Sequence, residues 1–191
     1  MVGKYNPEIH SRRTIRLRDY DYSSPGAYFV TICTKRRENL FGEIIHGNMR
    51  LSEAGEIIQA VWDALPKRYP SIALDISVIM PNHVHGIIVL TDATDVGAGQ
   101  ALPGSEGAAS SAPTLGDVIR TFKSISAIQV SSVLGRTGQP LWQRNYYEHI
   151  IRNETSLARI REYIASNPQN WILDRQNPAN LAATSDFEEE L

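Results

Sequence analysis

The chain has 191 residues, of which 42% are hydrophobic and 21% are charged. This balance is close to the globular average, so it excludes fibrous and wholly disordered proteins and favours one domain, 1–191. The net charge of −2, from 19 basic and 21 acidic residues, differs from the basic balance typical of DNA-binding domains. No apolar run approaches the ~20 residues that span a bilayer, so we expect no membrane partner.

The cellular compartment can be predicted from two features. The start, MVGKYNPEIHSRR, lacks the apolar core of a secretory signal. The single cysteine, Cys33, cannot form an internal disulfide bond, which favours a reducing environment. We therefore expect a cytoplasmic protein.

The chain begins its predicted structure with strands. Residues 27–34 (AYFVTICT) are β-branched and aromatic, which indicates a strand. Residues 41–45 and 49–51 flank Gly47-Asn48, a pair typical of a hairpin turn.

A helix and a second hairpin follow. Ser52 is a suitable N-cap for a helix whose apolar residues recur at helical spacing, and Pro66 is expected to close it. Two apolar stretches, 72–80 and 84–90, are joined by only a few residues around Pro81 and predict two central strands in a tight hairpin.

The second half adds a loop, a helix, a strand and a last helix. Residues 93–113 are rich in Gly, Ala, Ser and Pro, so we expect a flexible surface loop. Apolar residues from Leu115 to Gln129 follow a helical stripe, and 146–151 indicates a strand. Asn153 is then a plausible N-cap for a helix that Pro168 ends.

Apart from the small hairpin, the order is β-α-β-β-α-β followed by one more helix. This order predicts an α+β fold of the ferredoxin-like, split-βαβ type, an antiparallel sheet with helices on one face plus a C-terminal helix. Residues 172–191 are expected to form a C-terminal tail. The fold hosts many activities, so function must be predicted from a site.

The sharpest local motif is PNHVHG, residues 81–86, which leads into a predicted strand. Side chains alternate along a strand, so His83 and His85 point to the same face and are a ready pair of metal ligands. The alternative is that both are ordinary polar residues at a strand start. Gly86 suggests that another group approaches the backbone closely.

A second motif lies in the last helix. Tyr163 and Asn167 are four residues apart and share one side of the helix, at the edge of its apolar stripe. Alone, they would fit a half-buried ring and a helix-ending amide. Together with the histidine pair they offer the nitrogen and oxygen ligands of a divalent cation, with a phenol beside it. The matching chemistry is nucleophilic attack on a phosphodiester.

These motifs, with LWQRNYYEHIIRN at 141–153 and YIxxNP at 163–168, resemble the single-tyrosine HUH transposases. The REP-associated tyrosine transposases and related insertion-sequence transposases are the most similar groups. The resemblance runs from about Tyr28 to Trp171, with the three motifs in the family's order. Insertion-sequence members carry Gln at the position of Asn167, which favours the REP-associated group.

The resemblance implies a single-stranded DNA endonuclease and strand transferase that acts at or near hairpin DNA in DNA transposition and recombination. Tyr163 would form a 5′-phosphotyrosine intermediate and release a 3′-hydroxyl. His83, His85 and Asn167 would bind Mg²⁺ or Mn²⁺, and no nucleotide cofactor is needed. A DNA partner implies association with the bacterial nucleoid. The insertion-sequence relatives work as dimers and the REP-associated group need not, so a homodimer stays open.

Several residues carry weaker predictions. Tyr146 and Tyr147 are rival nucleophiles, but they point to opposite faces of their strand and neither has a ligand one helical turn away. His149 is as readily structural as functional. Candidate DNA contacts are basic residues on the predicted surface: Arg12, Arg13, Arg16, Arg120, Lys123 and Arg152.

Two other functions remain open at this stage. A domesticated protein could bind hairpin DNA without cutting it, which would suit the acidic balance. A hydrolase could instead use a metal-activated water at the histidine pair, and its activity would survive the loss of Tyr163.

Overall fold

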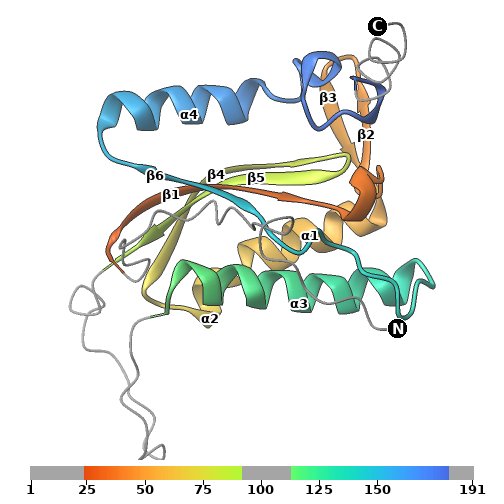
Figure 1. The fold of residues 1–191 in the computed structure, drawn as a ribbon, viewed down its shortest axis with the longest axis horizontal. Helices are drawn as coiled ribbons and strands as arrows, with labels where there is room; N and C mark the ends of the chain where they lie inside the picture. The colour runs from red at the N-terminus through yellow and green to blue at the C-terminus, as the bar shows by residue number, and fades with distance from the viewer. Residues whose placement is uncertain (1–23, 92–112, 181–191) are drawn as a thin grey trace, which may run out of the picture.

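The structure is a computed structural model that describes residues 24–91 and 113–180. Its centre is a four-stranded antiparallel sheet with the strand order β4-β5-β1-β6 (Figure 1). The strands are β1 (Gly26–Cys33), β4 (Ile72–Met80), β5 (His83–Leu90) and β6 (Tyr147–Ile151). The predicted α+β, ferredoxin-like order is therefore confirmed.

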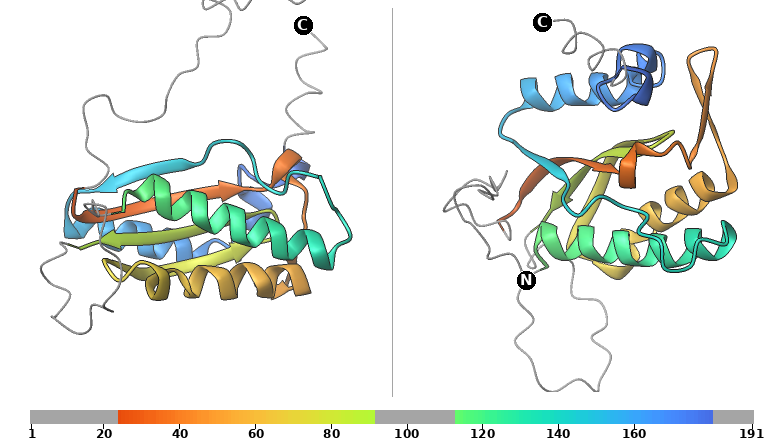
Figure 2. Two further views of the ribbon diagram at one scale, coloured as in Figure 1. Left: turned by 90° about the horizontal axis from the view of Figure 1, so that it is seen from below. Right: turned by 45° about the vertical axis from the view of Figure 1, so that its right-hand side comes forward.

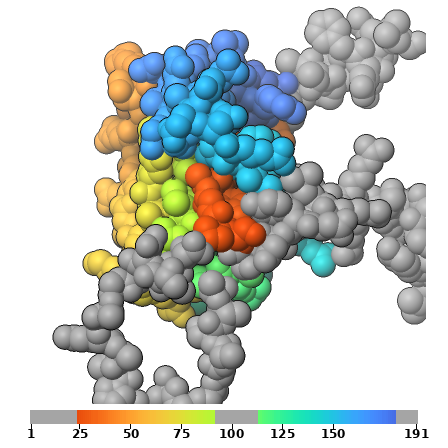
Figure 3. All heavy atoms as spheres, turned by 90° about the vertical axis from the view of Figure 1, so that its left-hand side faces the viewer, coloured from red at the N-terminus to blue at the C-terminus, as the bar shows by residue number. Residues whose placement is uncertain are grey.

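In the part of the chain that the structure describes, helices cover both faces of the sheet, three on one face and one on the other. α1 (Glu53–Asp63), α2 (Leu65–Arg68) and α3 (Leu115–Val133) cover one face, and α4 (Glu154–Ser166) covers the other (Figures 1 and 2). Seen from the side, α4 and β6 lie above β1, and α3 lies below it (Figure 3). The predicted C-terminal helix is thus present, and the sheet separates it from the other helices, a placement that the sequence did not predict.

The larger hydrophobic core lies between the sheet and α1 with α3. Trp62 of α1 and Phe122 of α3 are fully buried there, with their rings edge to face at a centroid distance of 5.3 Å. A smaller cluster beneath α4 joins Phe29, Ile87 and Ile164. Apolar faces thus hold both helical layers against the sheet.

Two helix predictions require correction at their ends. Ser52 caps α1 as expected, with its side chain accepting a hydrogen bond from the Gly55 amide. The helix ends at Asp63, however, and Pro66 lies in the first turn of α2, where a missing N–H costs nothing. α3 contains the predicted stripe from Leu115 to Gln129 and extends beyond it to Val133.

The small hairpin consists of β2 (Gly42–Ile45) and β3 (Asn48–Leu51). Its turn is centred on His46 and Gly47, both with positive φ, one position before the predicted Gly47-Asn48 pair. A Cβ built on Gly47 would lie 3.5 Å from Gln169 Cγ. The hairpin therefore reaches the segment that follows α4, and Figure 2 shows the two side by side.

Short 3-10 turns follow β1 (η1, Lys35–Arg37) and α4 (η2, Trp171–Leu173). Arg12, Arg13, Arg16 and all but Pro113 of the predicted loop 93–113 lie outside the described residues. Among the helices of the described part, none combines the length and apolar character needed to cross a bilayer.

Candidate active site

β5 positions the two histidines. Because side chains alternate along this strand, His83 and His85 both point to the face that α4 covers. They are 0% and 2% exposed, and their Nε2 atoms are 3.0 Å apart. The predicted convergence of the two imidazoles is therefore present.

Gly86, the residue between this pair and the rest of β5, faces the opposite layer. A Cβ built on Gly86 would lie 2.3 Å from Cζ2 of Trp62. The indole of α1 thus occupies the space where a side chain would stand, which explains the glycine in the motif.

Hydrogen bonds indicate how the imidazoles carry their protons. The Asn82 side-chain nitrogen donates to the carbonyls of Arg37 and Gln176, at 3.0 Å and 2.7 Å, so Asn82 Oδ1 is the acceptor for His83 Nδ1 at 2.8 Å. This network assigns the proton of His83 to Nδ1 and the lone pair to Nε2. His85 Nδ1 has the matching contact, 2.9 Å from Thr31 Oγ1.

Burial keeps both imidazoles neutral. It lowers the pKa of His85 to about 3, and it lowers the pKa of His83 well below its usual value, with the charge of a protonated His85 acting in the same direction. A neutral imidazole with an inward lone pair is the form that binds metal ions. Two such nitrogens face each other here.

α4 carries the candidate nucleophile. Asn153 caps the helix by accepting a hydrogen bond from the Ser156 amide, and Ile164 is fully buried against the sheet. About one turn before Ile164, Arg161 forms an ion pair with Asp75 of β4, with an N–O distance of 2.6 Å. These contacts fix the register of the helix, and Tyr163 Oη lies 3.3 Å from His85 Nε2.

Two oxygens complete the cluster. Asn167 is 3% exposed, and its Oδ1 has no hydrogen-bond partner. Asp174 Oδ2 is also buried without a hydrogen-bond partner and lies 3.8 Å from His83 Nε2. Ligand atoms of His83, His85 and Asp174 all lie within 4.8 Å of one another.

This donor set fits a divalent cation. Two imidazole nitrogens with inward lone pairs and two orphaned oxygens would all gain a partner from one ion, since a buried polar atom without one is costly. The buried His83–His85–Asp174 group could therefore hold a metal ion. Asp174 is the residue that sequence reasoning missed, because it lies in the predicted tail with no motif to mark it.

Burial sets the protonation of the two acidic groups in the site. Burial raises the pKa of Tyr163, and the neighbouring Asp174 carboxylate raises it further. Burial also raises the pKa of Asp174 itself. A cation beside these groups would favour both deprotonated forms, since opposite charge stabilises an anion.

A cavity of about 450 Å³ opens beside the tyrosine. Its lining comes from β1, η1, β5, the segment before β6, β6 itself, α4 and the segment after α4: Phe29, Thr31, Cys33, Arg37, His85, Gln143, Asn145, Tyr146, Tyr147, Tyr163, Asp174, Arg175 and Gln176. Tyr163 is 47% exposed, so its hydroxyl is accessible to a ligand in this space while still contacting the histidine pair.

Of the rival tyrosines, Tyr147 begins β6 and Tyr146 immediately precedes it, and both line the cavity beside Tyr163. Tyr147 contacts Phe29 on the α4 side, whereas Tyr146 packs against the larger core. His149 pairs with Phe29 in the strand register and is exposed. Tyr163 is instead the tyrosine whose hydroxyl lies within hydrogen-bonding distance of the histidine pair, 3.3 Å from His85 Nε2.

The described basic candidates have different surroundings. Arg120 is exposed and forms an ion pair with Asp117 at 2.9 Å. The Lys123 ammonium donates to the carbonyls of Gln143, Arg144 and Asn145, so its donors are used within the chain. Arg152 is exposed between β6 and α4. Their contact with DNA stays a prediction.

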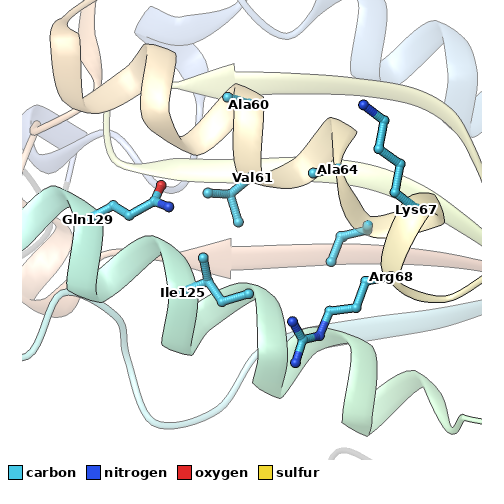
Figure 4. Close-up of a pocket in the computed structure, with 8 residues that line it drawn as sticks. Ala60, Val61, Ala64, Lys67, Arg68, Ile125 and Gln129 are labelled. Carbon is cyan, nitrogen blue, oxygen red and sulfur yellow. The ribbon is translucent and has the colours of Figure 1, made fainter. Parts of the chain in front are cut away.

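A second cavity, of about 460 Å³, lies on the far side of the sheet between α1, α2 and α3 (Figure 4). Apolar side chains such as Val61 and Ile125 line it, with Lys67 and Arg68 at one end. Its lining contains no His, Cys, Asp or Glu, so it lacks a nucleophile or metal ligand of the kind found beside Tyr163.

Comparison with known proteins finds a relative that is similar in sequence. No family model matches the chain. An uncharacterized protein from Haemophilus influenzae is 42% identical over 182 residues, covering 92% of this chain and 98% of that protein. The chain therefore belongs to the same family as the Haemophilus protein.

Two solved structures are similar. A REP-associated tyrosine transposase bound to a REP hairpin matches with a TM-score of 0.50 and 22% identity, over 80% of this chain and 72% of that chain. A candidate transposase from Deinococcus radiodurans matches with a TM-score of 0.44 and 19% identity, over 78% and 95% of the two chains. The first likeness confirms the predicted fold.

Proposed function

We propose that this chain is a metal-dependent single-stranded DNA endonuclease and strand transferase, a tyrosine transposase that cuts at or near hairpin DNA. The observation that carries the proposal is the position of Tyr163 Oη, 3.3 Å from Nε2 of His85, whose own partner His83 lies 3.0 Å further on. The hairpin bound to the structurally similar transposase supports the choice of DNA as the substrate.

In this proposal His83 and His85 hold Mg²⁺ or Mn²⁺, with Asn167 and Asp174 as the oxygen donors. When bound, the cation would supply Lewis-acid and orienting chemistry at the scissile phosphate. Tyr163 supplies the nucleophile, and α4 holds its hydroxyl at the cavity. Burial and the Asp174 carboxylate raise the pKa of Tyr163, so the phenol would lose its proton more readily beside a bound cation.

The bonds and protons of the covalent step balance without a nucleotide cofactor. A bond forms between Tyr163 Oη and the phosphorus as the bond from phosphorus to the 3′ oxygen breaks. The phenol gives up its proton to solvent and the departing 3′ oxygen takes one up, leaving a 5′-phosphotyrosine. Attack by a 3′-hydroxyl reverses these bonds and joins strands, because the phosphotyrosine link retains the energy.

The test is covalent capture of a labelled hairpin oligonucleotide with single-stranded flanks in the presence of Mn²⁺. We expect a denaturation-resistant adduct with the native chain and none with Tyr163→Phe, which keeps the ring and so binds the hairpin within about twofold of the native affinity. Tyr147→Phe is the matched control and should still form the adduct. An adduct that persists in Tyr163→Phe would rule out this nucleophile.

The other outcomes identify the alternatives. Hairpin binding by the native chain without any adduct would favour a non-cleaving hairpin-DNA-binding protein. Multiple-turnover hydrolysis that survives Tyr163→Phe would favour a metal-activated water. Association with the nucleoid stays a prediction that follows from the DNA partner, and a homodimer stays open.

A further inference from the structure

The cavity beside Tyr163 has the size and the walls of a binding site for a flat ring. Its volume of about 450 Å³ lies within the range of roughly 300–1,000 Å³ that small-molecule sites occupy. Aromatic residues from β1, β6 and α4 line one part of it, and side-chain amides line another. Three charged residues, Arg37, Asp174 and Arg175, also line it, and the combination of aromatic surface, amides and charged groups suits a ring with polar edges attached to a phosphate backbone.

Tyr147, like Tyr163, is an exposed aromatic group in this wall. Its side chain is 47% exposed although it is packed edge to face on the buried Phe29, at a centroid distance of 6.2 Å. Phe29 also contacts the ring of Tyr163 edge to face, at 6.0 Å. One buried ring therefore supports both tyrosines, so a ligand stacked on Tyr147 would lie next to the phenol of Tyr163.

The amides of Gln143 and Asn145 stand on a fixed backbone. The Lys123 ammonium donates to the carbonyls of both residues, and the Gln143 amide nitrogen donates to the Cys33 carbonyl at 2.9 Å. Within the described part of the chain, neither side-chain amide has a hydrogen-bond partner. Each thus offers one donor group and one acceptor to a ligand without loss of an internal contact.

We propose that this cavity binds one unpaired base of the DNA strand next to the cleaved phosphate. Tyr147 stacks on the base, and Gln143 and Asn145 hydrogen-bond to its edge and set a base preference. Unpaired bases are recognised by such stacking, and their edges match amide donors and acceptors. This inference rests on the proposed function and adds a determinant of substrate specificity to it.

The experiment measures binding alone, with EDTA present so that no cleavage occurs. The probe is a fluorescein-labelled hairpin oligonucleotide whose single-stranded flanks carry an abasic site at one position at a time, followed by fluorescence anisotropy. With the native chain we expect one position at which loss of the base weakens binding about tenfold. With Tyr147→Leu, binding to the intact oligonucleotide should fall about tenfold, and the abasic site at that position should have no further effect.

Three control variants assign the contacts. Tyr147→Phe retains the aromatic face and should behave as the native chain. Gln143→Leu with Asn145→Leu should retain affinity within a few-fold but lose the preference among four bases at the sensitive position. Gln129→Leu, an exposed amide at the cavity of Figure 4, should change neither property.

The outcomes separate this inference from the proposed function. If the abasic penalty is unchanged in Tyr147→Leu, or if no position is sensitive, the base site is wrong even when the covalent adduct forms. If the Tyr147-dependent position exists but no adduct forms with Mn²⁺, the base site stands and the endonuclease proposal is wrong. A base preference that survives loss of both amides would overturn their assigned role.

Discussion

At the scale of single residues, the proton positions of the site depend on Asn82 and Thr31. Each contacts the Nδ1 atom of one histidine, so the two Nε2 lone pairs converge at 3.0 Å in a buried space. Two lone pairs at that distance repel each other unless a proton or a cation lies between them. When each neutral imidazole carries its proton on Nδ1, no proton lies between the two Nε2 atoms, and the arrangement suits a cation.

The first prediction concerns acid stability of the chain in EDTA. Because the pKa of His85 falls to about 3 on folding and that of His83 falls as well, the folded state binds fewer protons than the unfolded state below the unfolded pKa of about 6.5. Stability must then fall as the pH falls. Between pH 7 and pH 5.5 the two histidines together should cost about 2 kcal/mol of unfolding free energy.

Urea unfolding at the two pH values measures this loss. The double variant His83→Gln/His85→Gln should lose that part of the pH dependence, whereas His149→Gln, at an exposed position of β6, should keep it. An equal pH dependence in the native chain and the double variant would show that the imidazoles are not held neutral by burial.

Most of the site could be predicted because it follows local periodicity. Strand alternation places His83 beside His85, and helical spacing places Tyr163 beside Asn167. Asp174 follows no such rule. It reaches the histidines only because the chain turns back after α4, where Asn82 and Arg37 bind the carbonyls of Gln176 and Arg175. These contacts join segments that are far apart in the sequence.

At the scale of elements, the packing of β5 on α1 connects the core to the site. Gly86 lies one residue after His85, and the indole of Trp62 fills the position of its absent side chain. Trp62 cannot move away easily, because it is fully buried and contacts Phe122. A larger residue at position 86 must therefore push β5 toward α4 and displace the imidazoles.

The second prediction is that Gly86→Ala destabilises the fold by about 3 kcal/mol, as overpacking of a core does, and weakens metal binding. Urea unfolding and calorimetric titration with Mn²⁺ measure the two effects. In a Trp62→Phe background the smaller ring leaves space, so the added cost of Gly86→Ala should shrink by at least half. Independent, additive costs in the double variant would show that the two residues do not collide.

The element boundaries show where sequence patterns are informative. Alternating and β-branched runs predicted all four strands of the sheet, since these strands are buried on at least one side. Pro66 was expected to end the first helix, but proline is also accepted in a first turn and here belongs to α2. Proline can therefore mark either the end of one helix or the start of the next, and only tertiary packing decides between the two.

At the scale of the whole molecule, three segments meet at one side chain. Asn82, in the turn between β4 and β5, donates to Arg37 after β1 and to Gln176 after α4, and it accepts from His83. The Gln176 side chain in turn accepts from the thiol of Cys33 at 3.4 Å. Tertiary structure thus links the position of His83 to the accessibility of the only cysteine in the chain.

The last prediction uses that cysteine as a reporter of the link. In the native chain Cys33 should react slowly with iodoacetamide, because burial raises its pKa to about 11 and Gln176 covers it. Asn82→Ala should release the segment 174–176, speed the labelling about tenfold, and weaken Mn²⁺ binding by roughly 10- to 100-fold because His83 loses its partner.

Asn82→Asp keeps an acceptor for His83 but loses both donors, so labelling should rise while Mn²⁺ affinity falls less. Asn48→Ala, an exposed amide in the small hairpin, is the matched control and should alter neither. Labelling that stays slow in both Asn82 variants, in chains shown by circular dichroism to be folded, would mean that Asn82 does not hold the returning segment over the site.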